Sequence, residues 1–355
     1  MKIVYLVSQL SGGGAERTVA YLSEYTSKID GVESVILSLS DEVFYKLGEQ
    51  VEFISLGIPQ KNKNPLDRLK KAFLRLIKVR KAIKKLKPDV VFCMLATTAK
   101  YLPKKRSYKL ICSERSNPLI VKDKKQIKIR DKILLNCDGI VFQTKRAKEC
   151  FLKEIQDKGV VIPNAVGNPY VLKAEPVDHP NKTITAMGRF NKAKGYPTLI
   201  KAFKIISEKH PEFMLEIFGG GNKEDIEKLV SDLNLSDKVK FMGAREDAVL
   251  EVSKSTCYVL SSIYEGMPNA LMEAMAVGTA CVSTDCPFGP SELIVDGVNG
   301  LLVPVGDENA LASAVIKVIE NDDLRLKLSQ NAKKILETNS VEIIAEKYYQ
   351  FIKNS

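Results

Sequence analysis

Residues 261–292, SSIYEGMPNALMEAMAVGTACVSTDCPFGPSE, carry the most structural information in this chain of 355 residues. Glu265 lies in a turn that the following glycine and proline make rigid. A helix can begin near Asn269 and includes Glu273. A loop carboxylate and a carboxylate in the first turns of a helix can bracket one ligand, with the helix amides as donors. Two solvated glutamates beside an ordinary helix cap are the alternative.

The run 265–273, EGMPNALME, resembles the E-x7-E element of retaining glycosyltransferases with the GT-B fold, in particular glycosyltransferase family 4. Three more segments resemble motifs of this family, and they follow one another along the chain in the same order as in the family. Residues 187–195, MGRFNKAKG, are similar to its G-R-x-x-x-x-K-G segment, and 218–221, FGGG, to its glycine-rich turn after the next strand. Residues 11–17, SGGGAER, are similar to its glycine loop after the first strand. Four motifs in one order argue against chance.

Composition agrees with this class. With 45% apolar and 27% charged residues the chain is globular and long enough for two domains. The apolar run 2–7 at the N-terminus is too short for a signal-peptide core or a membrane-spanning helix, so a cytoplasmic protein is expected. The seven cysteines form no C-x-x-C pair and mostly lie in apolar strand-like runs, which favours reduced, unmetallated thiols.

Strand-like runs alternate with segments of helical spacing twice along the chain, and a stretch rich in proline and turn-forming residues separates the two series. The first series is 3–7, 34–39, 52–56, 89–95, 110–113 and 139–143. The second is 183–187, 213–218, 239–242, 257–261, 280–284 and 301–303. The hinge is predicted at 161–169 and 176–180. This pattern predicts an α/β protein of two doubly wound, Rossmann-like domains.

We therefore expect one domain at 1–165 and a second at 166–338, and the resemblance implies that the first binds the acceptor and the second the nucleotide sugar. Residues 339–355 form an amphipathic helix with apolar positions at Val341, Ile344, Ala345, Tyr348 and Ile352. The resemblance to GT-B proteins implies that the two domains face a cleft. It also implies that the final helix crosses back to pack on the N-terminal domain.

Glycines 12 to 14 follow the first strand and open a helix. A dinucleotide fingerprint would need a third glycine where Arg17 stands, which disfavours a dehydrogenase. Gly13 and Gly14 are instead expected to lie over the phosphate or sugar of a ligand, where backbone amides and the helix terminus face negative charge. A flexible turn is the alternative. Glu16 and Arg17 are expected on the helix surface or the acceptor side.

Arg189 and Lys194 are expected at the carboxyl edge of a parallel sheet, where open α/β folds bind ligands. An arginine and a lysine there could stabilise a departing diphosphate without metal. Two exposed basic residues are the alternative. The chain has no D-x-D sequence, the metal-binding motif of the GT-A class, so neither a metal nor another cofactor is expected.

The resemblance also implies a role for each matching residue. Arg189 and Lys194 hold the diphosphate, Glu273 accepts hydrogen bonds from the ribose, and Glu265 faces the donor sugar. Glu265, Arg189 and Lys194 are thus the expected catalytic residues. The sugar pocket is completed by Gly266, Met267, Pro268 and Asn269. The nucleobase side is formed by Phe218, Gly219, Ala244 and Arg245, and a second loop near the diphosphate by Gly289, Pro290 and Ser291.

One departure from the family concerns histidine. Many relatives carry a histidine near the reaction centre where this chain has 113–117, SERSN, and the two histidines here, His179 and His210, each precede a proline outside the motifs. A histidine base is not expected. The family's retaining mechanism, in which the leaving diphosphate helps to deprotonate the acceptor, fits the sequence. Glu114 and Arg115 are either sugar or acceptor contacts or a loop ion pair.

Charge is unevenly distributed. Residues 1–165 contain 33 Lys and Arg against 17 Asp and Glu, a net charge of +16, whereas 166–355 have a net charge of −5. Lys61 to Lys87 contain twelve basic residues and one acid, with apolar residues at helical spacing, which predicts a basic amphipathic helix. It could be a solvated surface, a nucleic-acid site or a contact for an anionic membrane leaflet. Nucleic acid is disfavoured because no recognition motif or stacking platform accompanies the charge.

The sequence thus predicts a retaining, metal-independent hexosyltransferase that is cytoplasmic and peripheral on the inner face of the cell membrane. Its partners are a nucleotide-sugar donor, such as UDP-GlcNAc, UDP-GalNAc, UDP-Gal or UDP-Glc, and a lipid-diphosphate-linked saccharide acceptor. An anionic membrane surface is contacted through Lys61–Lys87, and the pathway is surface-polysaccharide or capsule synthesis. The alternatives are a UDP-sugar epimerase of similar fold and a non-enzymatic protein that binds anions or membranes.

Overall fold

The structure, a computed structural model, describes residues 1–60, 64–115, 117–174 and 180–355. Expectations for Lys61, Ser116, His179 and most of the predicted hinge segment 176–180 lie outside the described residues. The chain forms two compact units, Met1–Gly167 with Val341–Ser355 as unit 1, and Asn168–Ser340 as unit 2. Each unit is described here by itself.

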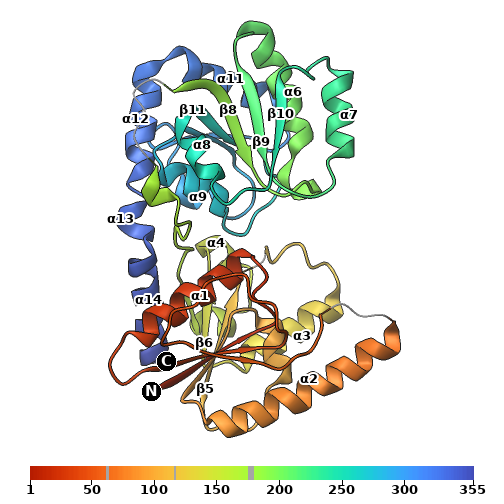
Figure 1. The fold of residues 1–355 in the computed structure, drawn as a ribbon, viewed down its shortest axis with the longest axis vertical. Coiled ribbons are helices and arrows are strands. Elements are labelled where there is room, and N and C mark those ends of the chain that lie inside the picture. The colour runs from red at the N-terminus through yellow and green to blue at the C-terminus, as the bar shows by residue number, and fades with distance from the viewer. Residues whose placement is uncertain (61–63, 116, 175–179) are drawn as a thin grey trace. The chain divides into compact units, whose positions relative to one another are not determined.

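The elements of unit 1 are shown in Figure 1. They are β1 (Lys2–Val7), α1 (Gly14–Ser27), β2 (Glu33–Ser38), β3 (Glu52–Ser55), α2 (Pro65–Leu86), β4 (Val90–Cys93), η1 (Ala96–Tyr101), β5 (Lys109–Glu114), α3 (Lys124–Leu135), β6 (Gly139–Phe142), α4 (Lys145–Glu149), α5 (Lys153–Asp157), β7 (Gly159–Val161) and α14 (Val341–Asn354).

The strands of unit 1 form one parallel sheet in the order β3-β2-β1-β4-β5-β6-β7. Leu6 of β1 pairs with Leu37 on one side and with Cys93 on the other. Strand β7 was not expected, because Val161 was assigned to the hinge. Its three residues pair with β6 at the edge of the sheet, and so short a strand carries little periodic signal.

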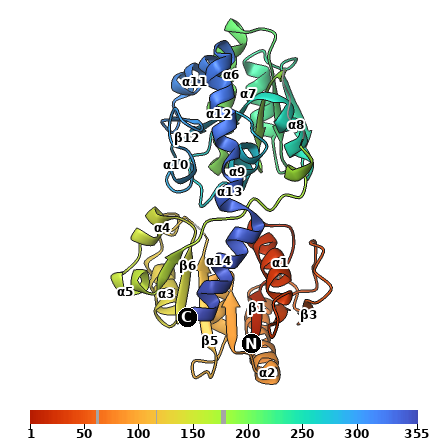
Figure 2. The ribbon, with the colours of Figure 1, turned by 90° about the vertical axis from the view of Figure 1, so that its left-hand side faces the viewer.

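Helices cover both faces of this sheet, as its continuous apolar strands require. Side chains of α2, η1 and α3 pack on one face, including Val79, Ile83 and Leu134. Side chains of α1 and α14 pack on the other, including Leu22 and Tyr348. Figure 2 shows α14 lying beside α1 in unit 1. The C-terminal helix therefore belongs to the N-terminal sheet.

Unit 2 repeats the architecture. Its elements are η2 (Val171–Lys173), β8 (Asn181–Met187), η3 (Lys192–Lys194), α6 (Tyr196–Lys209), β9 (Met214–Phe218), α7 (Glu224–Asp232), β10 (Val239–Gly243), α8 (Ala248–Lys254), β11 (Ser255–Leu260), α9 (Asn269–Ala276), β12 (Cys281–Thr284), α10 (Pro290–Leu293), β13 (Leu301–Val303), α11 (Glu308–Glu320), α12 (Asp322–Lys333) and α13 (Leu336–Asn339). The strands are parallel, in the order β10-β9-β8-β11-β12-β13. Both units are thus Rossmann-like, as the alternating pattern predicted.

Helix α2 begins and ends at clear local signals. The Asn64 side chain accepts a hydrogen bond from the Asp67 amide, and Pro65 occupies the first helical position. Lys87 ends the helix in the left-handed conformation, with φ 47°, and Pro88 follows. In the part of the chain that the structure describes, no helix combines the length and apolar character needed to cross a bilayer.

Candidate active site

The strand order of unit 2 places two predicted motifs side by side. The chain proceeds from β8 outward through β9 and β10, then returns to the other side of β8 with β11. Strands β8 and β11 are neighbours, and the loops that follow them run in opposite directions. Open α/β sheets bind ligands in the crevice between two such loops. The first loop contains Arg189 and Lys194, and the second contains Glu265.

Lys194 and Glu265 form an ion pair across these loops. The Nζ atom of Lys194 lies 2.7 Å from Oε1 of Glu265, and their side chains are 19% and 12% exposed. The Ser262 hydroxyl donates to the same carboxylate oxygen at 2.6 Å. The Ser261 hydroxyl donates to the Lys194 carbonyl at 2.8 Å, and the Ile263 amide to the Ala193 carbonyl at 2.7 Å. The carboxylate is thus held by an ammonium and a hydroxyl in a fixed place.

A thiol lies close to this pair but stays neutral. Burial, together with the nearby Glu265 carboxylate, raises the pKa of Cys286 to about 12. The thiolate is the nucleophilic form of cysteine, so this side chain contributes packing and not reactivity. All seven cysteines are free thiols, and six of them are buried.

The glycines of the two N-terminal motifs of unit 2 allow their loops to stack. A Cβ at Gly219 would collide with the Gly188 carbonyl, and a Cβ at Gly195 with the Ser261 carbonyl. Gly195 also has φ +59°. Backbone hydrogen bonds join these loops. The Gly188 N–H donates to the Phe218 carbonyl at 2.9 Å, and the Gly219 N–H donates to the Gly243 carbonyl at 2.8 Å. Three strand-end loops thus form one backbone platform.

The second predicted loop packs on the Glu265 turn. A Cβ at Gly289, which has φ +93°, would collide with Pro268 and lie 3.1 Å from the Gly266 carbonyl. Met267 and Pro268 are buried, and Pro268 is followed directly by α9, which begins at Asn269. The structure therefore brings this loop against the predicted sugar pocket.

Glu273 lies in the second turn of α9 and is 8% exposed. The Asn168 side-chain amide donates to Glu273 Oε2 and to the Glu246 carbonyl, both at 3.2 Å. Sequence reasoning placed Asn168 in the hinge and gave it no role. No local signal could have found it, because 105 residues separate it from Glu273.

The remaining predicted residues of unit 2 lie at the same edge with different contacts. Arg189 is exposed at the start of its loop, and no ion pair of its side chain is found among the described residues. Ala244 lies beside Gly220, since a Cβ added at Gly220 would be 3.5 Å from the Ala244 Cβ. Arg245 is exposed, and its guanidinium donates two hydrogen bonds of 2.9 Å to the Asp247 carboxylate. These bonds lower the pKa of that carboxyl. Arg245 is thus engaged locally.

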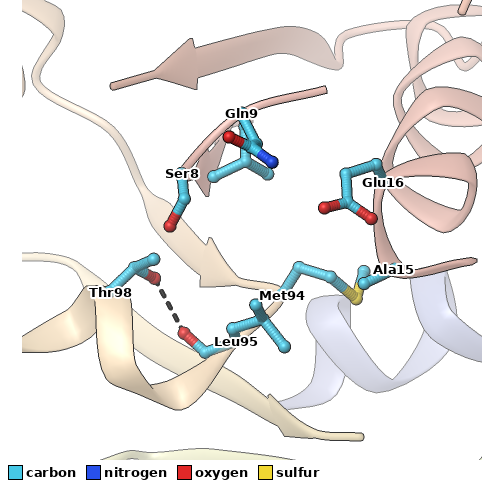
Figure 3. A pocket seen from close by; sticks show the side chains of 8 residues that line it. Ser8, Gln9, Ala15, Glu16, Met94, Leu95 and Thr98 are labelled. Atoms are coloured by element: carbon cyan, nitrogen blue, oxygen red, sulfur yellow. Dashed lines mark hydrogen bonds between the residues drawn. The ribbon is translucent and has the colours of Figure 1, made fainter. Parts of the chain in front are cut away.

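In unit 1 the corresponding strand-order reversal lies between β1 and β4. Figure 3 shows a pocket there, where Ser8 and Gln9 follow β1, Met94 and Leu95 follow β4, and Glu16 comes from α1. Its volume of about 20 Å³ is room for about one water molecule. Within unit 1, this pocket lies at the carboxyl edge of the sheet, the edge where open α/β folds bind ligands.

The glycine loop belongs to this edge of unit 1. Gly13 caps α1 in an extended conformation, and Gly14 is the first helical residue. A Cβ at Gly13 would collide with the Glu16 carboxylate, which folds back over the cap. The Tyr45 hydroxyl donates to the Gly13 carbonyl at 2.9 Å. Glu16 therefore covers the glycine loop.

Arg115, at the position where relatives often carry histidine, makes its hydrogen bonds inside unit 1. One guanidinium nitrogen donates to the Tyr348 hydroxyl of α14, and the other to the Thr18 hydroxyl of α1, each at 3.1 Å. The second nitrogen also bonds the Asn164 side chain. Arg115 thereby links β5 to both helices on that face.

His210 is not among the residues of unit 2 that form the candidate site. It follows α6 and its Nε2 atom is 3.0 Å from Glu320. Within the described residues, no three side chains of histidine, cysteine, aspartate or glutamate gather as a metal site.

Two family models match the chain, and together they cover most of it. Residues 12–167 match Glycosyltransferase Family 4, and residues 172–335 match Glycosyl transferases group 1. Solved structures agree with the GT-B fold. Sucrose-phosphate synthase from Thermosynechococcus elongatus has a TM-score of 0.85 at 20% identity, covering 100% of this chain and 98% of that one. Anabaena HepE in complex with UDP-glucose has a TM-score of 0.79 at 19% identity, covering 100% of both. The chain therefore belongs to the family 4 and group 1 glycosyltransferases with the GT-B fold.

Among similar curated proteins are two transferases of Campylobacter jejuni. One is the N-acetylgalactosamine-N,N'-diacetylbacillosaminyl-diphospho-undecaprenol 4-alpha-N-acetylgalactosaminyltransferase, 27% identical, with 94% of each chain covered. The other is the GalNAc-alpha-(1->4)-GalNAc-alpha-(1->3)-diNAcBac-PP-undecaprenol alpha-1,4-N-acetyl-D-galactosaminyltransferase, 28% identical, with 99% of this chain and 98% of that protein covered.

Proposed function

We propose that this glycosyltransferase moves a hexose-type sugar from a UDP-sugar to a lipid-diphosphate-linked saccharide, without a metal and with retention at the anomeric carbon. The observation that carries the proposal is the half-buried Lys194–Glu265 pair at the strand-order reversal of unit 2. A cation and a carboxylate held together there supply charge for a diphosphate and an acceptor for sugar hydroxyls.

In this proposal each predicted donor-site residue has one role. Lys194 and the exposed Arg189 bind the diphosphate and stabilise the charge that develops as it leaves. Glu265, positioned by Ser262, accepts hydrogen bonds from the sugar. Glu273, oriented by Asn168, accepts hydrogen bonds from the ribose.

The backbone platform supplies the nucleobase end of the site. Gly219 and Ala244 lie on adjacent loops after β9 and β10, so a base can lie against the backbone there. Arg245 would contribute its aliphatic stem, since its guanidinium bonds Asp247.

The reaction breaks the bond between the anomeric carbon and the diphosphate oxygen, and a hydroxyl of the acceptor forms the new glycosidic bond. The hydroxyl proton passes to the departing diphosphate, which leaves as a nucleoside diphosphate. Because attack and departure occur on one face of the sugar, the configuration is retained. Lys194 and Arg189 lower the barrier by holding the developing negative charge.

Unit 1 supports the acceptor part of the proposal. Helix α2 exposes Leu66, Leu69, Phe73, Leu74 and Ile77, which are 77%, 69%, 65%, 37% and 47% exposed. Basic residues interleave with these side chains, including the exposed Lys70, Lys81 and Lys85. Each basic residue near an anionic leaflet adds about 1 kcal/mol. The curated names of both Campylobacter relatives include a lipid-linked saccharide. We therefore place the enzyme on the cytoplasmic leaflet.

The decisive experiment has two stages. A thermal-shift screen of UDP-sugars and other nucleotide sugars identifies the donor, because saturation at 100 times Kd adds about 2.7 kcal/mol of stability. Transfer to short-chain lipid-diphosphate saccharides is then followed by NMR of the anomeric centre. An α-linked product from an α-linked donor supports the proposal, whereas inversion contradicts retention. Conversion of the nucleotide sugar without an acceptor would indicate an epimerase instead.

The membrane part is tested with liposomes. Replacing Lys70, Lys81 and Lys85 with Gln is expected to reduce sedimentation with anionic liposomes and to leave donor binding intact. Lys71 and Lys78 are left unchanged in this variant, because Lys71 pairs with Asp67 and Lys78 donates to the Leu56 carbonyl at 2.6 Å. Replacing them would disturb contacts within unit 1 as well as the surface charge. Equal sedimentation of the variant and the wild type would leave α2 as a solvated helix.

A further inference from the structure

A groove in unit 1 gathers basic side chains, none of which is assigned to the reaction. We call it the basic groove; it has a volume of about 690 Å³. Its cations are Arg80, Lys84 and Lys87 at the C-terminal end of α2, and Lys105 and Arg106 in the segment before β5. Such a volume admits a phosphate group with its substituents, and the cations favour an anion.

The basic groove lies at the amino edge of the sheet. Lys87 and Asp89 lie in the three residues before β4, and Tyr108 directly precedes β5. The pocket of Figure 3 lies at the opposite, carboxyl edge. The six residues of β5 span about 20 Å. The basic groove is thus separate from the carboxyl edge of the sheet in unit 1.

The charge of this groove is poorly compensated. Arg106 pairs with Asp138 at 2.9 Å, but no ion pair of Arg80, Lys84, Lys87 or Lys105 is found in the described ranges. Asp89 is the one carboxylate among the lining residues, and it accepts a hydrogen bond from the Lys2 amide at 2.7 Å, so these four cations outnumber it. Close like charges repel one another, so an anion bound among them would be stabilised.

Two polar atoms of the lining residues also lack partners. Nε of Arg106 and the hydroxyl of Tyr108 are buried without a hydrogen bond in the part of the chain that the structure describes. Both can donate, and buried donors are normally paired. Because protein covers both atoms, a phosphate in the groove would meet the exposed Lys84, Lys87 and Lys105 and not these two donors.

An apolar groove of about 530 Å³ adjoins the basic one. Pro103 lines both, and Arg106 donates to the carbonyl of Asn136, a residue of the apolar groove, at 2.7 Å. Most of its lining is apolar and consists of Ala99, Leu102, Pro103, Leu110, Ile129, Ile133 and Leu135. The other lining residues are Lys100, Lys104, Lys132 and Asn136, and the lysines can place their aliphatic stems along the apolar surface. Ile129 and Leu135 are 59% and 39% exposed, so hydrocarbon bound there would be shielded from water.

We propose that the two grooves together bind one anionic phospholipid, with its phosphate in the basic groove and a hydrocarbon chain in the apolar groove. A phospholipid joins these two chemistries in one molecule, whereas inorganic phosphate uses only the first. The exposed apolar side chains of α2, on the helix that supplies Arg80, Lys84 and Lys87, favour a lipid surface as the source. None of the groove residues is assigned to the donor site, and the inference rests on the proposed contact of α2 with an anionic leaflet.

The test uses the full chain and a short-chain phosphatidylglycerol below its micelle concentration, followed by isothermal titration calorimetry without a nucleotide sugar. The variant combines Lys84→Gln, Lys87→Gly and Lys105→Gln. Glycine at position 87 keeps the left-handed turn, because glycine adopts φ 47° without steric cost. The control replaces Lys228, Lys240 and Lys317 of unit 2 with Gln, with the same change in charge. A third variant, Ile129→Ser with Leu135→Ser, changes only the apolar groove.

The basic-groove variant is expected to bind the lipid at least about tenfold more weakly, given the contribution of each cation near an anionic lipid. The control should bind as the wild type does, and the apolar-groove variant more weakly while its thermal stability is retained. Wild-type affinity in the basic-groove variant would overturn the proposal. So would equal affinity of the wild type for phosphatidylcholine of the same chain length or for inorganic phosphate.

Discussion

The Nζ atom of Lys194 lies 2.7 Å from Oε1 of Glu265, although 71 residues separate them in the chain. This pair joins the two loops that diverge at the strand-order reversal of unit 2. Truncating either side chain leaves the other charge half-buried and without its ionic partner, which gives the first prediction.

Lys194→Ala is expected to lower kcat/KM by on the order of 2–4 kcal/mol in transition-state stabilisation, as for other charge-directed groups in active sites. Arg189→Ala should act in the same direction. Steady-state kinetics with the identified donor measure the effect. Lys192→Ala, an exposed lysine of the same turn, is the matched control and should retain activity. Full activity after loss of both Lys194 and Arg189 would exclude the diphosphate role.

Glu273→Ala is expected to raise KM for the donor with little change in kcat, because ribose contacts are shared by the ground and transition states. Glu265→Ala should mainly lower kcat. Asn168→Ala should weaken donor binding more mildly, since Asn168 orients Glu273. Glu208→Ala, an exposed residue of α6, serves as the control. Unchanged donor titrations in the Glu273 variant would contradict the ribose assignment.

Gly219→Ala is expected to destabilise unit 2 by about 1–3 kcal/mol, because its Cβ would collide with the Gly188 carbonyl and push the stacked loops apart. The affinity for the nucleotide-sugar donor should fall together with the stability. Gly220→Ala is a neighbouring control, since its Cβ would meet Ala244 at an ordinary 3.5 Å. Thermal unfolding of the two variants compares them directly. Similar melting temperatures would show that the platform relaxes without cost.

The contact between Tyr25 of α1 and Glu346 of α14 predicts a pH-dependent stability. The Tyr25 hydroxyl donates to Glu346 Oε2 at 2.6 Å, and this bond lowers the carboxyl pKa from 4.5. A lowered folded-state pKa contributes stability above the unfolded value, which is lost as pH falls through the folded value. Tyr25→Phe should therefore lower Tm by a few degrees at pH 7 and by less at pH 3. Tyr349→Phe on α14 is the control, and an equal loss at both pH values would contradict the linkage.

Transfer is expected to continue in the presence of a chelator, because Lys194 and Arg189 supply the positive charge that a metal would otherwise bring to the diphosphate. Activity with and without EDTA, and after adding back Mg²⁺ or Mn²⁺, measures this. If chelation abolished transfer and a divalent cation restored it, the metal-independent mechanism would be wrong.

Much of the fold could be predicted because its signals are local. The alternation of strand-like and helical runs depends on neighbours a few residues apart, and it gave the parallel Rossmann-like sheets that the structure shows. The signals around Asn269 and the apolar spacing from Val341 depend on similarly short distances, and α9 and α14 begin at these residues. Strand β7 was missed because three residues carry too little pattern.

The amino-acid sequence by itself determined the class of fold, the family and the residues that fall at strand ends. Only the tertiary structure decided which of those side chains meet. It joined Asn168 to Glu273, turned Arg115 toward Tyr348, and tied Lys78 to the Leu56 carbonyl while leaving other lysines of α2 exposed. These contacts depend on strand order and on how loops pack, which link residues far apart in the chain. Local spacing carries no information about such pairs.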